Sequence, residues 1–123
     1  MSGRMNGNAD WVYPGLKIWT KESSINTPGP SQAFVFVDED KDSIDDGFFA
    51  VRDPKGRNTG HWQNAPASRH GNGGNLSFAD GHVENWRWVE QTATAVKGLD
   101  TRTFANDRDL EKFRRASHLP DGL

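Results

Sequence analysis

Residues 69–84 of the chain read RHGNGGNLSFADGHVE, and this stretch decides the fold. An Asp-Gly pair between apolar residues predicts a β-hairpin, because a type I′ turn needs positive φ angles that Asp tolerates and Gly adopts freely. We expect Asp80 and Gly81 to form a two-residue turn, with Ala79 paired to His82. The stretch therefore predicts two antiparallel strands joined at Asp80-Gly81.

The expected register divides the hairpin residues between two faces of a sheet. Leu76, Phe78 and Val83 fall on one face, which must be the core. Asn85 and Arg87 fall on the same face, where they do not fit, and a β-bulge near the strand end would explain them. The other face carries a polar and aromatic mixture: Ser77, His82, Glu84, Trp86 and Trp88.

Length and composition indicate one small domain with many turns. The chain has 123 residues, only 33% of them hydrophobic, with 13 Gly and 6 Pro. Such a chain favours short strands joined by loops over a helical bundle. Seven Phe and five Trp indicate an aromatic core, although exposed tryptophans could instead form a platform for sugars. The tryptophans are Trp11, Trp19, Trp62, Trp86 and Trp88.

Three further elements complete the expected fold. Residues 32–37 contain an unbroken apolar run, which is typical of a strand covered on both faces. Residues 48–52 are expected to form its antiparallel partner. Residues 106–117 predict a helix, capped by Asn106 and with acidic residues in its first turn.

The predicted fold class is α+β, in a single domain over residues 1–123. We expect a small antiparallel sheet of about four or five short strands, long irregular loops and the C-terminal helix. Leu110 and Phe113 should be the inward residues of that helix. Lys112, Arg114 and Arg115 make a basic patch on it, which we expect to be solvated.

Charge and residue usage exclude several classes of function. The formal net charge is −2, without the basic excess that nucleic-acid binding requires. The absence of cysteine excludes disulfides and cysteine-ligated zinc. No Gly-x-Ser-x-Gly nucleophile motif or phosphate loop occurs. No run of 18 apolar residues occurs, so we expect this chain alone to be soluble. No catalytic residue is predicted.

An acidic loop is the first candidate metal site. Asp38, Asp40 and Asp42 have the spacing of the first three ligands of a calcium loop. The pattern then departs from that of an EF-hand, because Ser43 replaces its glycine and Phe49 its bidentate glutamate. The alternative is a solvated acidic turn between strands.

A second candidate metal site combines His70 with His82 and Glu84. His82 and Glu84 are two residues apart on a strand and so point the same way. If the glycine-rich loop brings His70 beside them, the three could hold zinc or iron in a metal-dependent enzyme. The alternative is a structural histidine whose ring nitrogens bond to backbone or to a carboxylate such as Asp80.

The spacing of His70 from Asp80-Gly81, with nine residues between, resembles the prepilin-type processing-associated H-X9-DG domain. Other stretches resemble the same family in the same order. They are Ser-Gly-Arg-Met-Asn-Gly at 2–7, Phe-Val-Phe-Val-Asp-Glu at 34–39, Asp-Ser-Ile-Asp-Asp-Gly-Phe-Phe at 42–49, Pro-Ala-Ser-Arg-His at 66–70, and Phe-Ala-Asp-Gly-His-Val-Glu at 78–84, followed by Trp88.

This resemblance implies a head domain of a type IV pilin-like or type II secretion pseudopilin-like protein of bacteria. Such a domain would be a non-enzymatic structural or assembly subunit, with other pilin-like subunits or secretion-apparatus proteins as partners. The family's N-terminal membrane helix is absent from this chain. If the full-length protein carries it, the domain would lie on the periplasmic or cell-surface side of the inner membrane. Calcium in the head loops is implied by fold analogy alone.

The resemblance also assigns a structural role to a set of motif residues, with no catalytic role among them. They are Asp38, Glu39, Ser43, Asp45, Gly47, His70, Asp80, Gly81, His82, Glu84 and Trp88.

Overall fold

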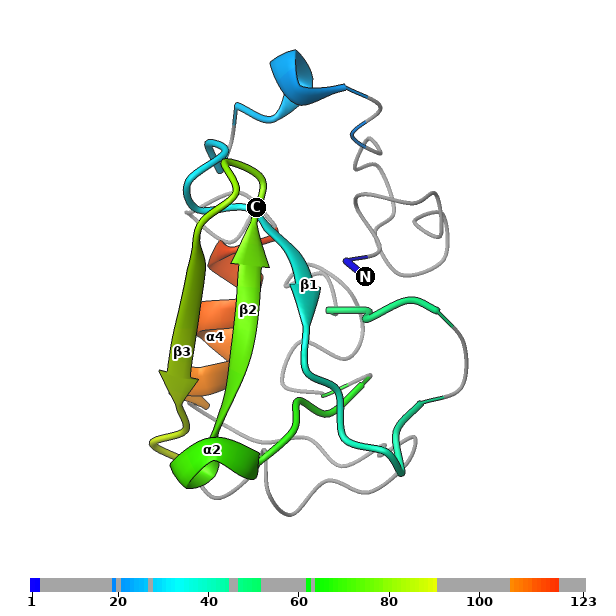
Figure 1. Ribbon diagram of the computed structural model, residues 1–123, viewed down its shortest axis with the longest axis vertical. Coiled ribbons are helices and arrows are strands. Elements are labelled where there is room, and N and C mark those ends of the chain that lie inside the picture. The colour runs from blue at the N-terminus through cyan, green and yellow to red at the C-terminus, as the bar shows by residue number, and fades with distance from the viewer. Residues whose placement is uncertain are drawn as a thin grey trace.

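A three-stranded antiparallel sheet backed by one helix organises the protein. The computed structural model describes residues 1–2, 19, 21–26, 28–44, 47–51, 62, 64–90 and 107–117. The sheet has the order β1-β2-β3, and helix α4 lies against one of its faces (Figure 1). This arrangement confirms the α+β class, with three described strands in place of the expected four or five. The elements are η1 (Glu22–Ser24), β1 (Phe34–Val37), α2 (Arg69–Asn72), β2 (Gly73–Phe78), β3 (Val83–Arg87) and α4 (Arg108–Arg115).

The hairpin forms at Asp80-Gly81, but the expected two-residue turn is wrong. The amide of Gly81 donates to the carbonyl of Phe78 at 2.9 Å, and the amide of Phe78 donates to the carbonyl of His82 at 2.9 Å. Gly81 has a φ of +95°, whereas Asp80 is not among the residues with positive φ. These contacts define a three-residue turn closed by a glycine bulge, the next most common hairpin connection.

The extra turn residue shifts the strand register by one and exchanges the faces of β3. Ser77 pairs with Val83 and Leu76 with Glu84. Trp86 therefore joins Leu76 on the buried face, while Val83, expected in the core, is 66% exposed. The shift also removes the misfit of Asn85 and Arg87, because both now lie on the exposed face.

Strand β1 is covered on one face only, contrary to the expectation for its apolar run. Its pairing with β2 shifts between Phe34 and Phe36, from Phe34↔Phe78 to Phe36↔Ser77. The irregularity turns Phe34 into the core, where it is fully buried, and leaves Phe36 56% exposed.

The expected pairing of residues 48–52 with the first strand is also wrong. Phe49 makes an isolated parallel bridge with Ser2, and Val51 makes an antiparallel bridge with Trp62. The amide of Ser2 donates to the carbonyl of Val35 at 2.7 Å, so Ser2 lies between β1 and Phe49. Arg52 lies outside the described residues.

The N-cap of helix α4 lies one residue later than predicted. Asp107 occupies the N-cap, and its carboxylate accepts hydrogen bonds from the amides of Asp109 and Leu110 at 3.0 and 3.1 Å. Asn106, the expected cap, lies outside the described residues. Among the residues that can be described, no helix is long and apolar enough to cross a membrane.

Phe113 of α4 lies at the centre of the aromatic core, as expected for an inward residue. It is fully buried, and its ring contacts aromatic rings from the sheet and from the loops. Because each large ring buries much apolar area, this cluster compensates for the small number of aliphatic residues. The neighbouring rings, with centroids 5.2–5.7 Å from that of Phe113, are Phe34, Phe49, Trp62, Trp86 and Trp88.

Candidate functional site

The residues His70 and Asp80-Gly81 lie at opposite ends of β2. His70 precedes the strand, in the short irregular helix α2, where it adopts a left-handed conformation with φ 59° and ψ 49°. Gly71 and Asn72 also have positive φ, of 75° and 63°. This turn directs the chain into β2, and such conformations persist only where surrounding contacts hold them.

Close approach to Trp86 explains the glycine at the start of β2. A Cβ atom on Gly73 would lie 2.4 Å from the carbonyl oxygen of Trp86, so only glycine fits. At Gly74 a Cβ would lie 3.2 Å from the Trp88 ring. The glycine-rich loop therefore serves close packing against β3.

His70 is held near the end of β1 through Asp38. The Nε2 atom of His70 lies 3.5 Å from Oδ2 of Asp38, and both side chains are partly exposed. The same carboxylate accepts a hydrogen bond from the amide of Asn75 at 3.2 Å, and the Asp38 amide donates to the carbonyl of Asn75 at 3.0 Å. Asp38 thus connects β1, β2 and the histidine turn.

Glu39 and Ser43 form a second connection, between the acidic loop and residues 64–67. The Ser43 hydroxyl is buried, donates to Oε1 of Glu39 at 2.9 Å and accepts from the amide of Ala65 at 3.1 Å. Asn64 is buried beside it and accepts from the amide of Ala50 at 2.8 Å. These bonds satisfy buried polar groups that would otherwise destabilise the fold.

Gly47 lies beside the first residue of the chain. Its carbonyl accepts a hydrogen bond from the amino group of Met1 at 3.1 Å. The amide of Phe49 donates to the carbonyl of Met1 at 2.6 Å. Asp45 lies outside the described residues, so its predicted role stays a prediction.

A chain of polar contacts runs from the hairpin turn to the core. Nδ1 of His82 contacts Oδ1 of Asp80, and Nε2 of His82 lies 2.6 Å from Oε2 of Glu84. The other oxygen of Glu84 accepts from the indole N–H of Trp86 at 2.8 Å. The imidazole also stacks on Phe78, with ring centroids 4.5 Å apart. Both ring nitrogens of His82 are therefore engaged.

The carboxylates of Glu84 and Asp80 favour the protonated form of His82. The hydrogen bond to Glu84, and then that to Asp80, raise the pKa of His82 above its ordinary value. Reciprocally, the hydrogen bond from His82 lowers the pKa of Glu84 and of Asp80. The three residues thus form a charge-assisted network at the surface of the hairpin.

The structure does not assemble either predicted metal site. His82 and Glu84 are adjacent, but His70 lies beyond the other end of β2, roughly 20 Å away for a six-residue strand. In the acidic loop, Asp38 bonds to Asn75, and the Asp40 carboxylate accepts from the amide of Asp42 at 2.9 Å. Among the described residues, no group of three His, Asp or Glu side chains is placed to hold a metal ion.

The described tryptophans do not form an exposed platform for sugars. All four are 6% exposed or less: Trp19, Trp62, Trp86 and Trp88. The indole N–H of Trp62 donates to Oδ2 of Asp107 at 2.8 Å, and that of Trp88 donates to the carbonyl of Ala67 at 2.8 Å. Trp11 lies outside the described residues.

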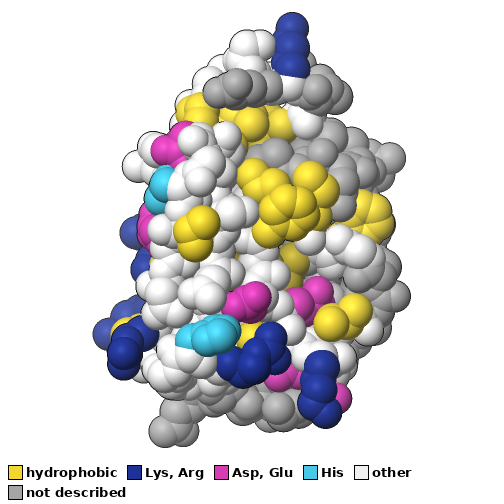
Figure 2. Space-filling view, viewed as in Figure 1, with side chains coloured by type: hydrophobic (Ala, Val, Ile, Leu, Met, Phe, Trp, Pro, Cys, Tyr) yellow, Lys and Arg dark blue, Asp and Glu magenta, His cyan; other side chains and the backbone are white. Residues whose placement is uncertain are grey.

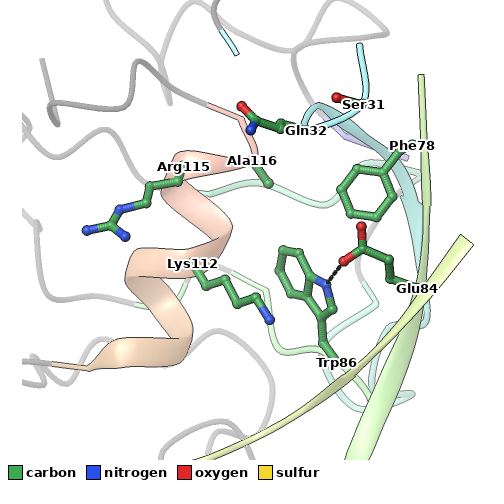
Figure 3. Close-up of a pocket in the computed structure, with 8 residues that line it drawn as sticks. All are labelled: Ser31, Gln32, Phe78, Glu84, Trp86, Lys112, Arg115 and Ala116. Atoms are coloured by element: carbon green, nitrogen blue, oxygen red, sulfur yellow. Dashed lines mark hydrogen bonds between the residues drawn. The ribbon is translucent and has the colours of Figure 1, made fainter. Parts of the chain in front are cut away.

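A pocket that the sequence did not indicate lies between the β2–β3 hairpin and α4 (Figure 3). It has a volume of about 330 Å³, within the range of small ligand sites. Lys112 and Arg115, expected to be simply solvated, line one side of it. Three separate segments form its wall, so no local pattern could have revealed it. The lining residues are Ser31, Gln32, Phe78, Glu84, Trp86, Lys112, Arg115 and Ala116.

Comparisons with known proteins give no relative. No protein-family model, no curated protein and no solved structure matches this chain.

Proposed function

We propose that this protein is the non-enzymatic head domain of a pilin-like subunit in a type II secretion or type IV pilus-like apparatus. The observation that carries the proposal is the ordered series of stretches along residues 2–88 that resemble the H-X9-DG domain family. One such motif would be weak support, whereas several in the same order are much more specific. Its location would be the periplasmic or cell-surface side of the inner membrane.

The contacts of the motif residues fit a structural role. The contact of His70 with Asp38 joins two segments that are distant in sequence. The Ser43 hydroxyl bonds to Glu39 within the acidic loop and to the distant Ala65. His82 is engaged at both ring nitrogens. Side chains committed to internal bonds are suited to holding a shape for assembly.

Exposed apolar side chains provide candidate contacts with neighbouring subunits. Phe36 and Val83 lie on the outer face of the sheet and are 56% and 66% exposed. Figure 2 shows separate hydrophobic groups on this face among polar side chains. Single exposed apolar side chains are normal on protein surfaces, so Phe36 and Val83 mark only where a neighbouring subunit could pack.

The two rival functions have less support. A metal-dependent enzyme would use His70 with His82 and Glu84, which lie at opposite ends of β2. A sugar-binding module would use exposed tryptophans, and the four described ones are buried. Neither rival has a described site with the geometry that it needs.

Deletion of the gene in the source bacterium tests the proposal. We expect loss of a set of exported proteins or of surface filaments, restored by the wild-type gene. Unchanged export and unchanged filaments in the deletion strain would overturn the proposal. A complementing Lys41→Gln copy is a suitable control, because Lys41 is highly exposed and lies 3.8 Å from Asp42 in a surface pair of small energetic weight.

A further inference from the structure

The pocket between the hairpin and α4 combines an aromatic wall with a cationic rim. Phe78 and Trp86 belong to the core, and both contribute to the wall. Their ring centroids are 6.0 Å apart, with the rings tilted by 51°. A wall of this kind accepts the apolar part of a ligand and removes it from water.

Lys112 provides the charge nearest to this wall. Its Nζ atom lies 4.3 Å from the centroid of the Trp86 ring, in a cation–π contact. Within the described part of the chain, no carboxylate lies within ion-pair distance of this ammonium group. Among the described residues, Lys112 is therefore a cation at the pocket without a carboxylate at ion-pair distance.

Arg115 adds a second positive charge on the same helix. In Figure 3 its side chain extends from α4 and points away from Phe78, Trp86 and Glu84, so its guanidinium group must turn to reach a ligand in the pocket. Its Nε atom lies 3.6 Å from Oε1 of Glu111, and the Arg115 side chain is 67% exposed. An exposed pair at this distance is weak, so the guanidinium group can turn to a ligand at little cost.

Glu84, the acidic residue of the pocket, is held as a carboxylate by hydrogen bonds within the protein, which lower its pKa. One oxygen of Glu84 contacts the His82 ring at 2.6 Å, and the other accepts from Trp86 at 2.8 Å. Because both of its oxygens are already engaged, Glu84 is a weaker binding group for a ligand cation than Lys112 and Arg115 are for a ligand anion. The charged residues that line the pocket are two cations, Lys112 and Arg115, and one carboxylate, that of Glu84.

We propose that this pocket binds a ligand in which an apolar group stands next to a carboxylate. The apolar group packs on Phe78 and Trp86, and the carboxylate pairs with Lys112 and Arg115. The C-terminal residue of a polypeptide has this chemistry, and so does a free aryl-substituted carboxylic acid. The volume of about 330 Å³ suits one such residue. This inference stands on the pocket alone and does not depend on the pilin-like role.

Three probes test the site by NMR, with the indole N–H resonance of Trp86 as the reporter. They are acetyl-Ala-Phe with a free carboxylate, its C-terminal amide, and 3-phenylpropionate. We expect the free acid to shift the Trp86 resonance and the amide to bind about tenfold more weakly, as loss of a charge-assisted contact implies. Comparable binding of 3-phenylpropionate would identify a free carboxylic acid as sufficient, whereas binding of the peptide alone would identify a chain terminus.

Two variants and a matched control complete the test. Lys112→Met keeps an apolar side chain over Trp86 and removes the charge, so it should retain the fold and weaken the acid about tenfold. Arg115→Gln should weaken it less. Arg108→Gln, on the same helix but outside the pocket, should leave binding unchanged. Equal binding of acid and amide, or an unperturbed Trp86 resonance with every probe, would overturn the proposal.

Discussion

Phe78 and His82 face each other across the hairpin turn, with ring centroids 4.5 Å apart and ring planes within 5° of parallel. The contact exists because the turn contains three residues, which pairs Phe78 with His82 through a backbone hydrogen bond. A two-residue turn would have paired Phe78 with Val83 instead. The stack thus reports the strand register of the hairpin.

Replacement of His82 by Gln should change the pH dependence of stability. The pKa of His82 is raised in the fold above its ordinary 6.5, so its contribution is fully present below pH 6.5 and is lost as the pH rises through the raised pKa. The pKa values of Asp80 and Glu84 are lowered from 3.8 and 4.5. Their contribution is present above those values and is lost as the pH falls through the lowered pKa values.

The difference in unfolding free energy between wild type and His82→Gln should therefore be largest between about pH 4.5 and 6.5. It should shrink as the pH rises above that window and as it falls below it. Urea unfolding at a series of pH values measures this difference, with Val83→Thr as the neighbouring control without a titrating group. A difference that is constant from pH 4 to pH 9 would contradict the His82 network.

Gly73→Ala should destabilise the protein by about 1–3 kcal/mol or more, as expected for overpacking. The added Cβ would lie 2.4 Å from the Trp86 carbonyl oxygen, and backbone cannot move aside cheaply. Gly29→Ala is the matched control, because no heavy atom lies within 4 Å of the Cβ position there. Urea unfolding compares the two, and equal stabilities would refute the close approach of β2 to β3.

Phe113→Ala should cost about 3–5 kcal/mol of stability, because it leaves a cavity among five aromatic rings. Phe36→Ala, at a position 56% exposed, should cost less than about 1 kcal/mol. Thermal and chemical unfolding report both values. If Phe113→Ala does not fold, Phe113→Leu should fold with reduced stability, and a Leu variant as stable as wild type would argue against the aromatic core.

Ser43→Ala should cost about 1–3 kcal/mol, because the Ala65 amide loses its acceptor in a buried site. Ser24→Ala removes a hydroxyl that donates to the Lys21 carbonyl in an exposed turn, so it should have little effect. Denaturant unfolding of both variants measures the difference. A Ser43 variant no less stable than the Ser24 control would show that the Glu39–Ser43–Ala65 connection is not structural.

Local sequence signals predicted where the hairpin and the C-terminal helix lie better than they predicted how the strands pair. The residues of α4 carry acidic side chains at its start and basic ones at its end, and both Leu110 and Phe113 are buried as expected. The hairpin position at Asp80-Gly81 was also correct. Its register was not, because an Asp-Gly pair serves both two-residue and three-residue turns. The sequence did indicate this error, because the predicted register placed the polar side chains of Asn85 and Arg87 on the core face.

Contacts between distant segments could not be predicted from the sequence. His70 and Asp38 are 32 positions apart, and no periodic pattern links a left-handed turn to the end of another strand. By contrast, His82 and Glu84 are two residues apart, and their shared direction follows from strand geometry. The pocket beside Lys112 is lined by three segments that are separate in the sequence, so it can be recognised only in the tertiary structure.

The most direct test of the pilin-like role is to identify the neighbours of this protein in its own cells. Intact cells producing the epitope-tagged protein at its natural level are treated with a cross-linker, and the adducts are identified by mass spectrometry. Our account predicts adducts with other pilin-like subunits or secretion-apparatus proteins, in the fraction that contains the inner membrane. Recovery of the protein without any such adduct, in the cytosolic fraction, would contradict it.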